Sequence, residues 1–157
     1  MLRDNKTIIS KPVAADYTAS AKVACGMGVV LNTTNKTFAP PSAAGDTNIF
    51  LVDKERIPTG MYTALSDFSD YDDIFMTVNV GEYAKLKKYL PGEEFMTDQY
   101  AEGVAAGKYV NVGTDGKFAA LASGTSRYLC IGIVNDNDHK LALIQVCEAV
   151  ATESPTE

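Results

Sequence analysis

Short apolar and β-branched runs, separated by polar turns, follow one another along most of the chain. The breaks hold Gly, Pro, Asn and Asp, which are the residues that turns prefer. Several short strands divided in this way are typical of an all-β sandwich or barrel. We therefore predict a mainly β, compact sandwich or barrel-like domain built of hairpins. The predicted strands are residues 28–31, 37–39, 48–53, 74–80, 94–97, 109–113, 117–120, 128–135 and 140–146.

Two hairpins are predicted most clearly. Residues 128–134 and 140–146 are long β-branched runs that flank the polar loop 135–139, so they are expected to pair antiparallel. Residues 109–113 and 117–120 flank Thr-Asp-Gly, where the Asp115-Gly116 step supplies the positive φ that a tight turn needs.

One segment has a helical pattern. Residues 81–90, GEYAKLKKYL, place Tyr83, Leu86 and Leu90 on one face, and Pro91-Gly92 ends the segment. We predict one short helix there, with an extended strand as the alternative that such a short stretch leaves open. Residues 98–106 are a second, shorter possibility.

The two ends of the chain lack a core pattern. Residues 1–24 are mixed in character and Pro12 breaks any helix, so they are expected to form an extended N-terminal arm. Residues 25–149 form the β-rich domain, and residues 150–157 are expected to be a disordered tail because they are small, polar and acidic. No secretory leader or membrane span is apparent, which favours synthesis in a cytoplasm.

The two halves of the domain share a weak internal sequence repeat. The stretches that begin near Gly28 and Gly107 each run through a β-rich segment and a polar turn to Lys and then Phe-Ala. Each continues through a loop of small residues into another strand. We interpret this layout as a strand-turn-strand-loop-strand unit used twice, the second copy carrying residues 140–146 as an extra partner.

Composition narrows the possible chemistry. The chain has one histidine, three cysteines and a net charge of −6, so it has few groups for catalysis and does not favour nucleic acid or an anionic membrane. His139 lies in a polar turn and is expected to be exposed, whereas Cys25, Cys130 and Cys147 lack metal-ligand spacing and are expected to be buried free thiols. The acidic segments 66–75 and 135–139 lack the calcium-loop pattern. We predict no catalytic, cofactor or metal site, and hence no enzyme. A hydrolase built on Cys25, His139 and an Asp is the alternative.

The second half of the chain resembles tailed-bacteriophage capsid decoration proteins, also called cement or head-auxiliary proteins. Residues 92–124 read GEEFMTDQYAEGVAAGKYVNVGTDGKFAALASG, and YLCIGIVND follows from Tyr128. The likeness lies in the Thr97-Asp-Gln-Tyr100 lead-in, in the hairpin from Gly107 to Ala119 and in the Ile131-Gly-Ile-Val134 strand. It covers about the last sixty residues.

The resemblance implies a non-enzymatic virion structural protein that binds the outer surface of a phage capsid and stabilises the head shell. Its partner would be the major capsid protein lattice. Whether the protein is a monomer or self-associates as a trimer is left open. It would be located on the capsid exterior after synthesis in the host bacterial cytoplasm. We expect the N-terminal arm to dock there, because an arm that orders on binding can cover a large surface. Its expected anchors are Leu2, Ile8, Ile9, Val13 and Tyr17.

Two other functions remain open at this stage. The chain could be another phage structural protein, such as a head fibre or tail component. It could also be a carbohydrate-binding β-sandwich that uses its eight tyrosines, although it has no tryptophan.

Overall fold

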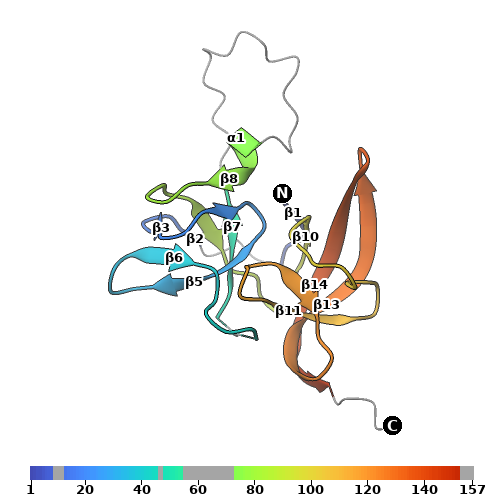
Figure 1. The fold of residues 1–157 in the computed structure, drawn as a ribbon. Helices are drawn as coiled ribbons and strands as arrows, with labels where there is room; N and C mark the ends of the chain where they lie inside the picture. The colour runs from blue at the N-terminus through green and yellow to red at the C-terminus, as the bar shows by residue number, and fades with distance from the viewer. Residues whose placement is uncertain (9–12, 46–47, 55–72, 153–157) are drawn as a thin grey trace.

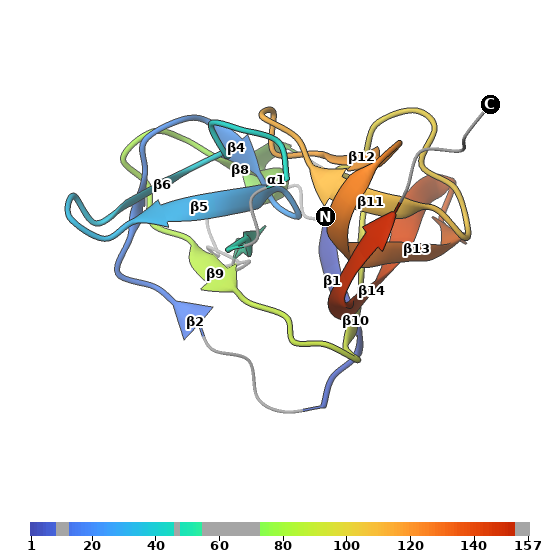
Figure 2. The ribbon, with the colours of Figure 1, turned by 90° about the horizontal axis from the view of Figure 1, so that it is seen from below.

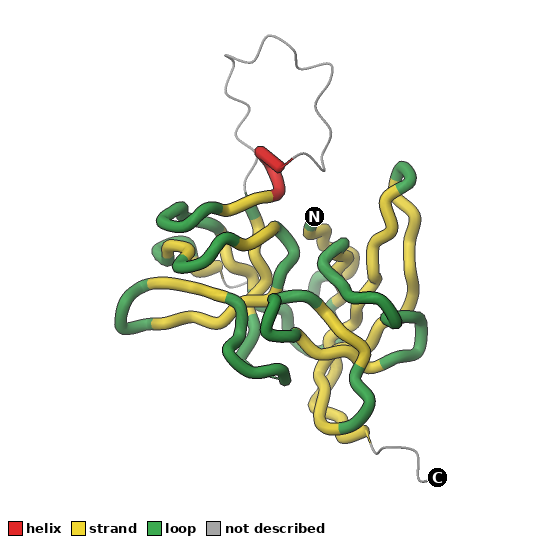
Figure 3. The backbone as a smooth tube through the Cα atoms, in the orientation of Figure 1, coloured by secondary structure: helices red, strands yellow, loops and turns green. Residues whose placement is uncertain are grey.

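The computed structural model describes residues 1–8, 13–45, 48–54 and 73–152, and it confirms a mainly β protein. Strands dominate the chain, with one short helix among these residues, α1 (Asp73–Met76) (Figures 1 and 3). Two six-stranded sheets make up the molecule and lie side by side (Figure 2). A short two-stranded sheet, β4 (Val23–Ala24) with β8 (Thr77–Val78), accompanies the first of them.

The first sheet is built from the first half of the chain and has the order β2-β9-β7-β5-β6-β3. Its strands are β2 (Val13–Ala14), β3 (Thr18–Ala19), β5 (Gly28–Asn32), β6 (Thr37–Ala39), β7 (Phe50–Asp53) and β9 (Lys85–Lys87). The two strands at its ends, β2 and β3, are neighbours in the sequence. The short stretch of chain between them brings the two edges of the sheet together, so the sheet curls, and we call this curled sheet the first barrel.

The second sheet is built from the second half of the chain plus the N-terminal strand, in the order β1-β10-β14-β13-β11-β12. Its strands are β1 (Leu2–Lys6), β10 (Glu94–Thr97), β11 (Tyr109–Val112), β12 (Phe118–Ala120), β13 (Gly124–Asp136) and β14 (His139–Thr152). Tyr100, just after β10, forms a parallel bridge with Phe118 of β12. That bridge closes strands β10–β14 into what we call the second barrel.

The two barrels have the same strand order and the same register. Each begins with a bent segment, β2–β3 in the first barrel and β10 to Tyr100 in the second. A hairpin follows, β5–β6 or β11–β12, and a third strand, β7 or β13, pairs with the first strand of that hairpin. The fourth strand, β9 or β14, then pairs with both the third strand and the bent segment. The positions that correspond, first barrel before second, are Ala14 and Phe95, Val29 and Val110, Leu31 and Val112, Phe38 and Phe118, Val52 and Cys130, and Leu86 and Ile144.

The closing contacts agree with this correspondence. Ala19 pairs in parallel with Phe38, and Tyr100 pairs in parallel with Phe118. The structure therefore supports the predicted repeat as one architecture used twice. It changes the register that the sequence suggested, because Gly107 corresponds to Gly26 by its hydrogen bonds and not to Gly28.

Each barrel has its own apolar core, made largely from corresponding positions. Phe38 and Phe118 are both buried, and so are Ala84 and Ala142, which lie two residues before the paired Leu86 and Ile144. The cores also meet, because Ile49 and Leu51 of the first half belong to the core of the second barrel. The remaining members of the two cores are Tyr17, Ala19, Val23, Val29, Val52 and Val78 in the first barrel, and Tyr89, Phe95, Val104, Val110, Val112, Cys130 and Val146 in the second.

The predicted helix at residues 81–90 is wrong. Residues 85–87 form β9 instead, where Leu86 is fully buried between two half-buried lysines. Buried and partly exposed side chains alternate along β9, as in a strand, but the lysines look like solvent-exposed residues in the sequence. Their long stems can lie along a barrel wall while their ammonium groups reach water. The possible helix at 98–106 is also replaced by turns and a bridge, and the predicted strand at 74–80 is reduced to β8 behind α1.

The segment predicted as an arm is extended, but it is paired within the molecule. Its described residues supply β1 to the second sheet, β2 and β3 to the first barrel, and β4 to the small sheet. The predicted boundary between residues 24 and 25 does not separate a loose arm from the domain, because Val23–Ala24 form β4, which pairs with β8, and the next residue, Cys25, is buried. At the other end β14 continues to Thr152, so part of the predicted tail is strand, and residues 153–157 lie outside the described residues.

Candidate docking surface

The β13–β14 hairpin is the longest element of the fold and projects beyond the second barrel (Figure 1). The sequence predicted this hairpin, but with a loop over residues 135–139. In the structure the strands continue to Asp136 and His139, and Asn137 and Asp138 alone form the turn. Both have positive φ, 49° and 68°, as a type I′ turn requires, and Asn and Asp tolerate that conformation best after Gly.

The outer edge of β13 is paired over only part of its length. Tyr128 and Leu129 pair with β11, and Cys130 completes that side by bonding to Lys108 and Gly107 at 2.9 and 2.8 Å. A register shift between Cys130 and Gly132 marks a β-bulge at Ile131, which bends the strand away from β11. No further strand among the described residues pairs with residues 131–135 on the side away from β14. We call residues 131–135 the open edge.

The open edge is apolar and exposed. Ile131, Ile133 and Val134 expose 37%, 40% and 37% of their surface. Ile133 and Val134 are consecutive, so they point to opposite faces of the ribbon and both faces are exposed there. Sequence analysis predicted this Ile-Gly-Ile-Val run as part of the 128–135 strand, without indicating that its outer side lacks a partner.

The opposite strand holds the open edge in place. Leu141 and Ala142 of β14, which face Val134 and Ile133 across the ladder, are fully buried. Arg3 of β1 also reaches across to the hairpin and pairs with Asp136 at 2.8 Å. The ribbon is therefore anchored along β14 and near its tip.

Other exposed apolar side chains lie elsewhere on the molecule. Val80 and Tyr83, on the loop between β8 and β9, expose 65% and 68% of their surface, and Ile8 exposes 59%. Val80 and Tyr83 belong to a segment with other strand contacts: Gly81 donates to Ala19, and Tyr83 bridges Thr18. These residues therefore do not form a run of strand with one side left unpaired, as the open edge does.

The residues predicted as capsid anchors are dispersed. Tyr17 is buried in the first core, under the Lys36 ammonium at 5.0 Å from the ring centroid, and Leu2 packs against the second core. These two residues contribute to packing within the chain instead of to an exposed docking arm. Ile8 is exposed, Val13 lies in β2, and Ile9 lies outside the described residues.

A cluster of charged groups joins the two barrels through β1. Lys87 of β9 pairs with Asp53 of β7 at 2.8 Å and with Asp4 of β1 at 3.2 Å. The Tyr89 hydroxyl donates to the same Asp4 carboxylate. Burial opposes the charge on Lys87, but its bonds with Asp53 and Asp4 outweigh that effect and raise its pKa. Burial and the bond to Asp4 raise the pKa of Tyr89 well above its usual value. These groups hold β1 in place.

Glu93 is the one charged side chain that is almost fully buried in the described chain. Its carboxylate accepts the Leu90 amide at 2.8 Å and the Ile8 amide at 3.0 Å. A buried carboxylate is tolerated when such donors replace its water. Glu93 therefore fastens the end of β1 to the turn between the two barrels.

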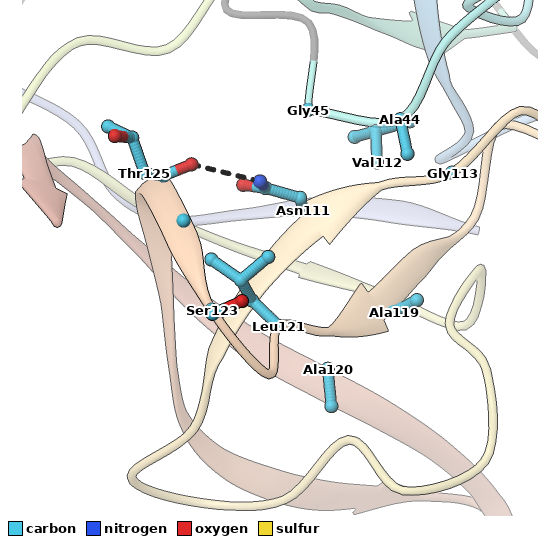
Figure 4. A pocket seen from close by; sticks show the side chains of 11 residues that line it. Ala44, Gly45, Asn111, Val112, Gly113, Ala119, Ala120, Leu121, Ser123 and Thr125 are labelled. Atoms are coloured by element: carbon cyan, nitrogen blue, oxygen red, sulfur yellow. Dashed lines mark hydrogen bonds between the residues drawn. The ribbon is translucent and has the colours of Figure 1, made fainter. Parts of the chain in front are cut away.

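A pocket with a volume of about 390 Å³ lies where the 44–45 loop approaches β11 and β12 (Figure 4). Its wall is made mainly of small side chains, including Gly45 and Ala119, together with Leu121. Asn111 reaches across one side and donates to the Thr125 carbonyl at 3.0 Å. The pocket has no charged side chain in its lining, so it offers little to orient a polar ligand.

The groups considered for catalysis are not assembled. His139 is exposed in the hairpin, as predicted, whereas Cys25 is buried between Met1 and Met76. Cys25 and Cys130 are buried free thiols, as predicted, and Cys147 is half-buried. Burial raises the pKa of all three thiols, which disfavours the reactive thiolate.

Of the predicted acidic segments, residues 66–72 lie outside the described residues. The described chain contains no group of three or more His, Cys, Asp or Glu that could hold a metal ion. Within the same residues, no helix has the length and apolar character needed to cross a membrane.

Neither protein-family comparison nor comparison with curated proteins finds a match for this chain.

Proposed function

We propose that this chain is a non-enzymatic structural protein of a phage virion, which binds the outer surface of the capsid and stabilises the head shell. The observation that carries the proposal is the exposed apolar open edge on a firmly anchored hairpin, in the part of the chain that resembles decoration proteins. Exposed apolar surface held on a rigid framework is typical of a site that binds another protein.

The fold suits such a task. Two barrels whose cores meet through Ile49 and Leu51, with β1 paired to the second sheet, form one packed unit that could bridge neighbouring subunits. The shell lattice would be the partner, and the capsid exterior the location. The docking element in this proposal is the β13–β14 hairpin, with Ile8 as an additional contact, in place of a loose N-terminal arm.

The test is a binding experiment with the purified protein and heads of the phage that encodes it, prepared from a mutant lacking this protein. We expect saturable binding in a sedimentation assay, at a fixed number of copies per shell, and a higher temperature of shell disruption. Absence of binding to heads, together with recovery of the protein in purified tails or fibres, would replace this function with the alternative structural role.

A further inference from the structure

We infer that the open edge binds an extended, apolar peptide segment of a partner protein by strand addition. The inference rests on the proposed function in one respect: in that setting, the partner is a subunit of the shell. The main-chain argument itself depends only on the structure. An extended backbone is what can pair with the alternating N–H and C=O groups along an unpaired strand.

The two barrels differ at this place, which shows that the barrel does not require an apolar edge. Asp53 follows Val52 in the first barrel as Ile131 follows Cys130 in the second. Asp53 is ion-paired with Lys87, and the next residue, Lys54, donates to the Thr77 carbonyl at 2.6 Å. The second barrel has Ile131 and Gly132 where the first has the two charged residues Asp53 and Lys54.

A comparison with β1 leads to the same conclusion. β1 is also an outer strand, since it pairs with β10 alone, but it carries Arg3, Asp4 and Lys6. Charged side chains on an outer strand are a common protection against unwanted pairing. Residues 131–134 of the open edge have no charged residue and no proline.

The size and charge of the site favour a peptide segment over a second copy of this chain. A strand of this length spans about 17 Å. Stable dimers usually bury roughly 1,200–2,000 Å² in total, which such a short edge does not provide alone. Each copy also carries a net charge of −6, so two copies repel each other. A tethered segment needs little area, because the rest of the partner supplies further contacts.

The site also indicates the chemistry of the segment. Apolar side chains at alternate positions would lie beside Ile131 and Ile133. A basic residue near one end would meet Asp138, which is exposed at the hairpin turn. The expected ligand is therefore an extended segment with alternating Val or Ile and a flanking Lys or Arg.

The test uses a defined probe, the fluorescent peptide Lys-Thr-Val-Thr-Val-Thr-Val-Lys with blocked ends, and the same peptide with N-methyl groups on alternate backbone nitrogens. Methylation keeps the side chains but removes backbone donors. Ile133→Lys places a charge on the open edge, and Val80→Lys adds the same charge at an exposed apolar position elsewhere. Thermal unfolding is measured first to establish that both variants fold.

We expect the unmodified peptide to bind to the wild type and to Val80→Lys with equal affinity, and at least tenfold more weakly to Ile133→Lys. We expect no binding of the methylated peptide. Amide hydrogen exchange of residues 131–135 should slow when the peptide binds. Equal binding of both peptides, or no loss on Ile133→Lys, would overturn strand addition, as would absence of binding at millimolar concentration.

The same two variants separate this inference from the proposed function. If heads bind the wild type and Ile133→Lys equally, the open edge is not the docking site although the proposed function stands. If the peptide result holds but heads do not bind, the edge stands and the proposed function fails. A dimer in light scattering that Ile133→Lys dissociates would identify a second copy as the occupant and overturn the peptide partner.

Discussion

Gly26 and Gly107 occupy the same position in the two barrels. Gly26 donates to the Val52 carbonyl at 2.8 Å, and Gly107 donates to the Cys130 carbonyl at the same distance. Both have positive φ, 91° and 82°. Each glycine precedes the first strand of its barrel's hairpin, β5 or β11. The two glycines therefore mark the same point of the repeated unit.

The surroundings of these glycines differ, which makes them a matched pair for mutation. A Cβ on Gly26 would lie 2.4 Å from the Met1 carbonyl oxygen and from Thr97 Oγ1, whereas a Cβ on Gly107 would meet nothing within 4 Å. Both alanine variants bear the conformational cost of positive φ, about 1–2 kcal/mol. We expect Gly26→Ala to be considerably more destabilising, as measured by urea unfolding. Equal losses would show that Met1 does not pack against Gly26.

The two central phenylalanines test whether the barrels are energetically equivalent. Phe38 and Phe118 are both buried, and each lies beside the parallel contact that closes its barrel. Replacing either with Ala should lower the free energy of unfolding by about 3–5 kcal/mol. Because the cores meet, we expect each variant to unfold in a single transition detected identically by circular dichroism and tyrosine fluorescence. Two separate transitions would mean that the barrels unfold independently.

Glu93 and Glu94 provide a contrast between neighbouring carboxylates. Glu93→Ala leaves the Ile8 and Leu90 amides without their buried acceptor, which should destabilise the protein by roughly 1–3 kcal/mol per unsatisfied group. Glu94 is more exposed and bonds to the exposed Asn5 side chain, so Glu94→Ala should cost less than about 1 kcal/mol. Denaturant unfolding measures both. A loss for Glu94→Ala as large as that for Glu93→Ala would contradict this role of Glu93.

Tyr89 should make stability depend on alkaline pH. Its folded pKa is raised above its ordinary value of 10.0, so the folded state keeps a proton that the unfolded state releases. Its contribution is therefore complete below about pH 10 and falls at higher pH by up to about 1.4 kcal/mol per pH unit. Tyr89→Phe should reduce this slope in unfolding experiments between pH 9 and 11.5.

The control for this measurement is Tyr83→Phe, which removes an exposed tyrosine hydroxyl. Some slope should persist in Tyr89→Phe, because the raised pKa of Lys87 acts in the same direction above pH 10.5. An unchanged slope in Tyr89→Phe would contradict both the burial of the Tyr89 hydroxyl and its bond to Asp4.

The sequence was informative where side-chain pattern and turn chemistry agreed. The 109–120 hairpin was predicted from the Asp115-Gly116 step, and Gly116 has the expected positive φ. The 128–146 hairpin was predicted from two β-branched runs that flank a polar loop. The 94–97 and 37–39 strands were also predicted with the bounds that β10 and β6 have.

The pattern failed where a strand is short or lies at the outside of a sheet. After Leu2, β1 has only polar residues, and its place depends on partners more than eighty positions away, such as Lys87 and Tyr89 for Asp4. β9 was mistaken for helix because its one buried central residue, Leu86, defines no period by itself. The open edge was not recognised, although its strand was predicted, because hydrophobicity identifies what can be buried and not whether another strand is present to cover it.

The shared strand order of the two barrels has a consequence for the order in which they fold. The first barrel joins Ala14 to Leu86, a separation of 86 − 14 = 72 positions, and the second joins Phe95 to Ile144, a separation of 144 − 95 = 49 positions. Contacts between distant positions form late, because the entropy of closing the intervening loop is lost before the contact forms. The second barrel should therefore assemble first, although it is synthesised last, and serve as the template on which the N-terminal half completes its fold.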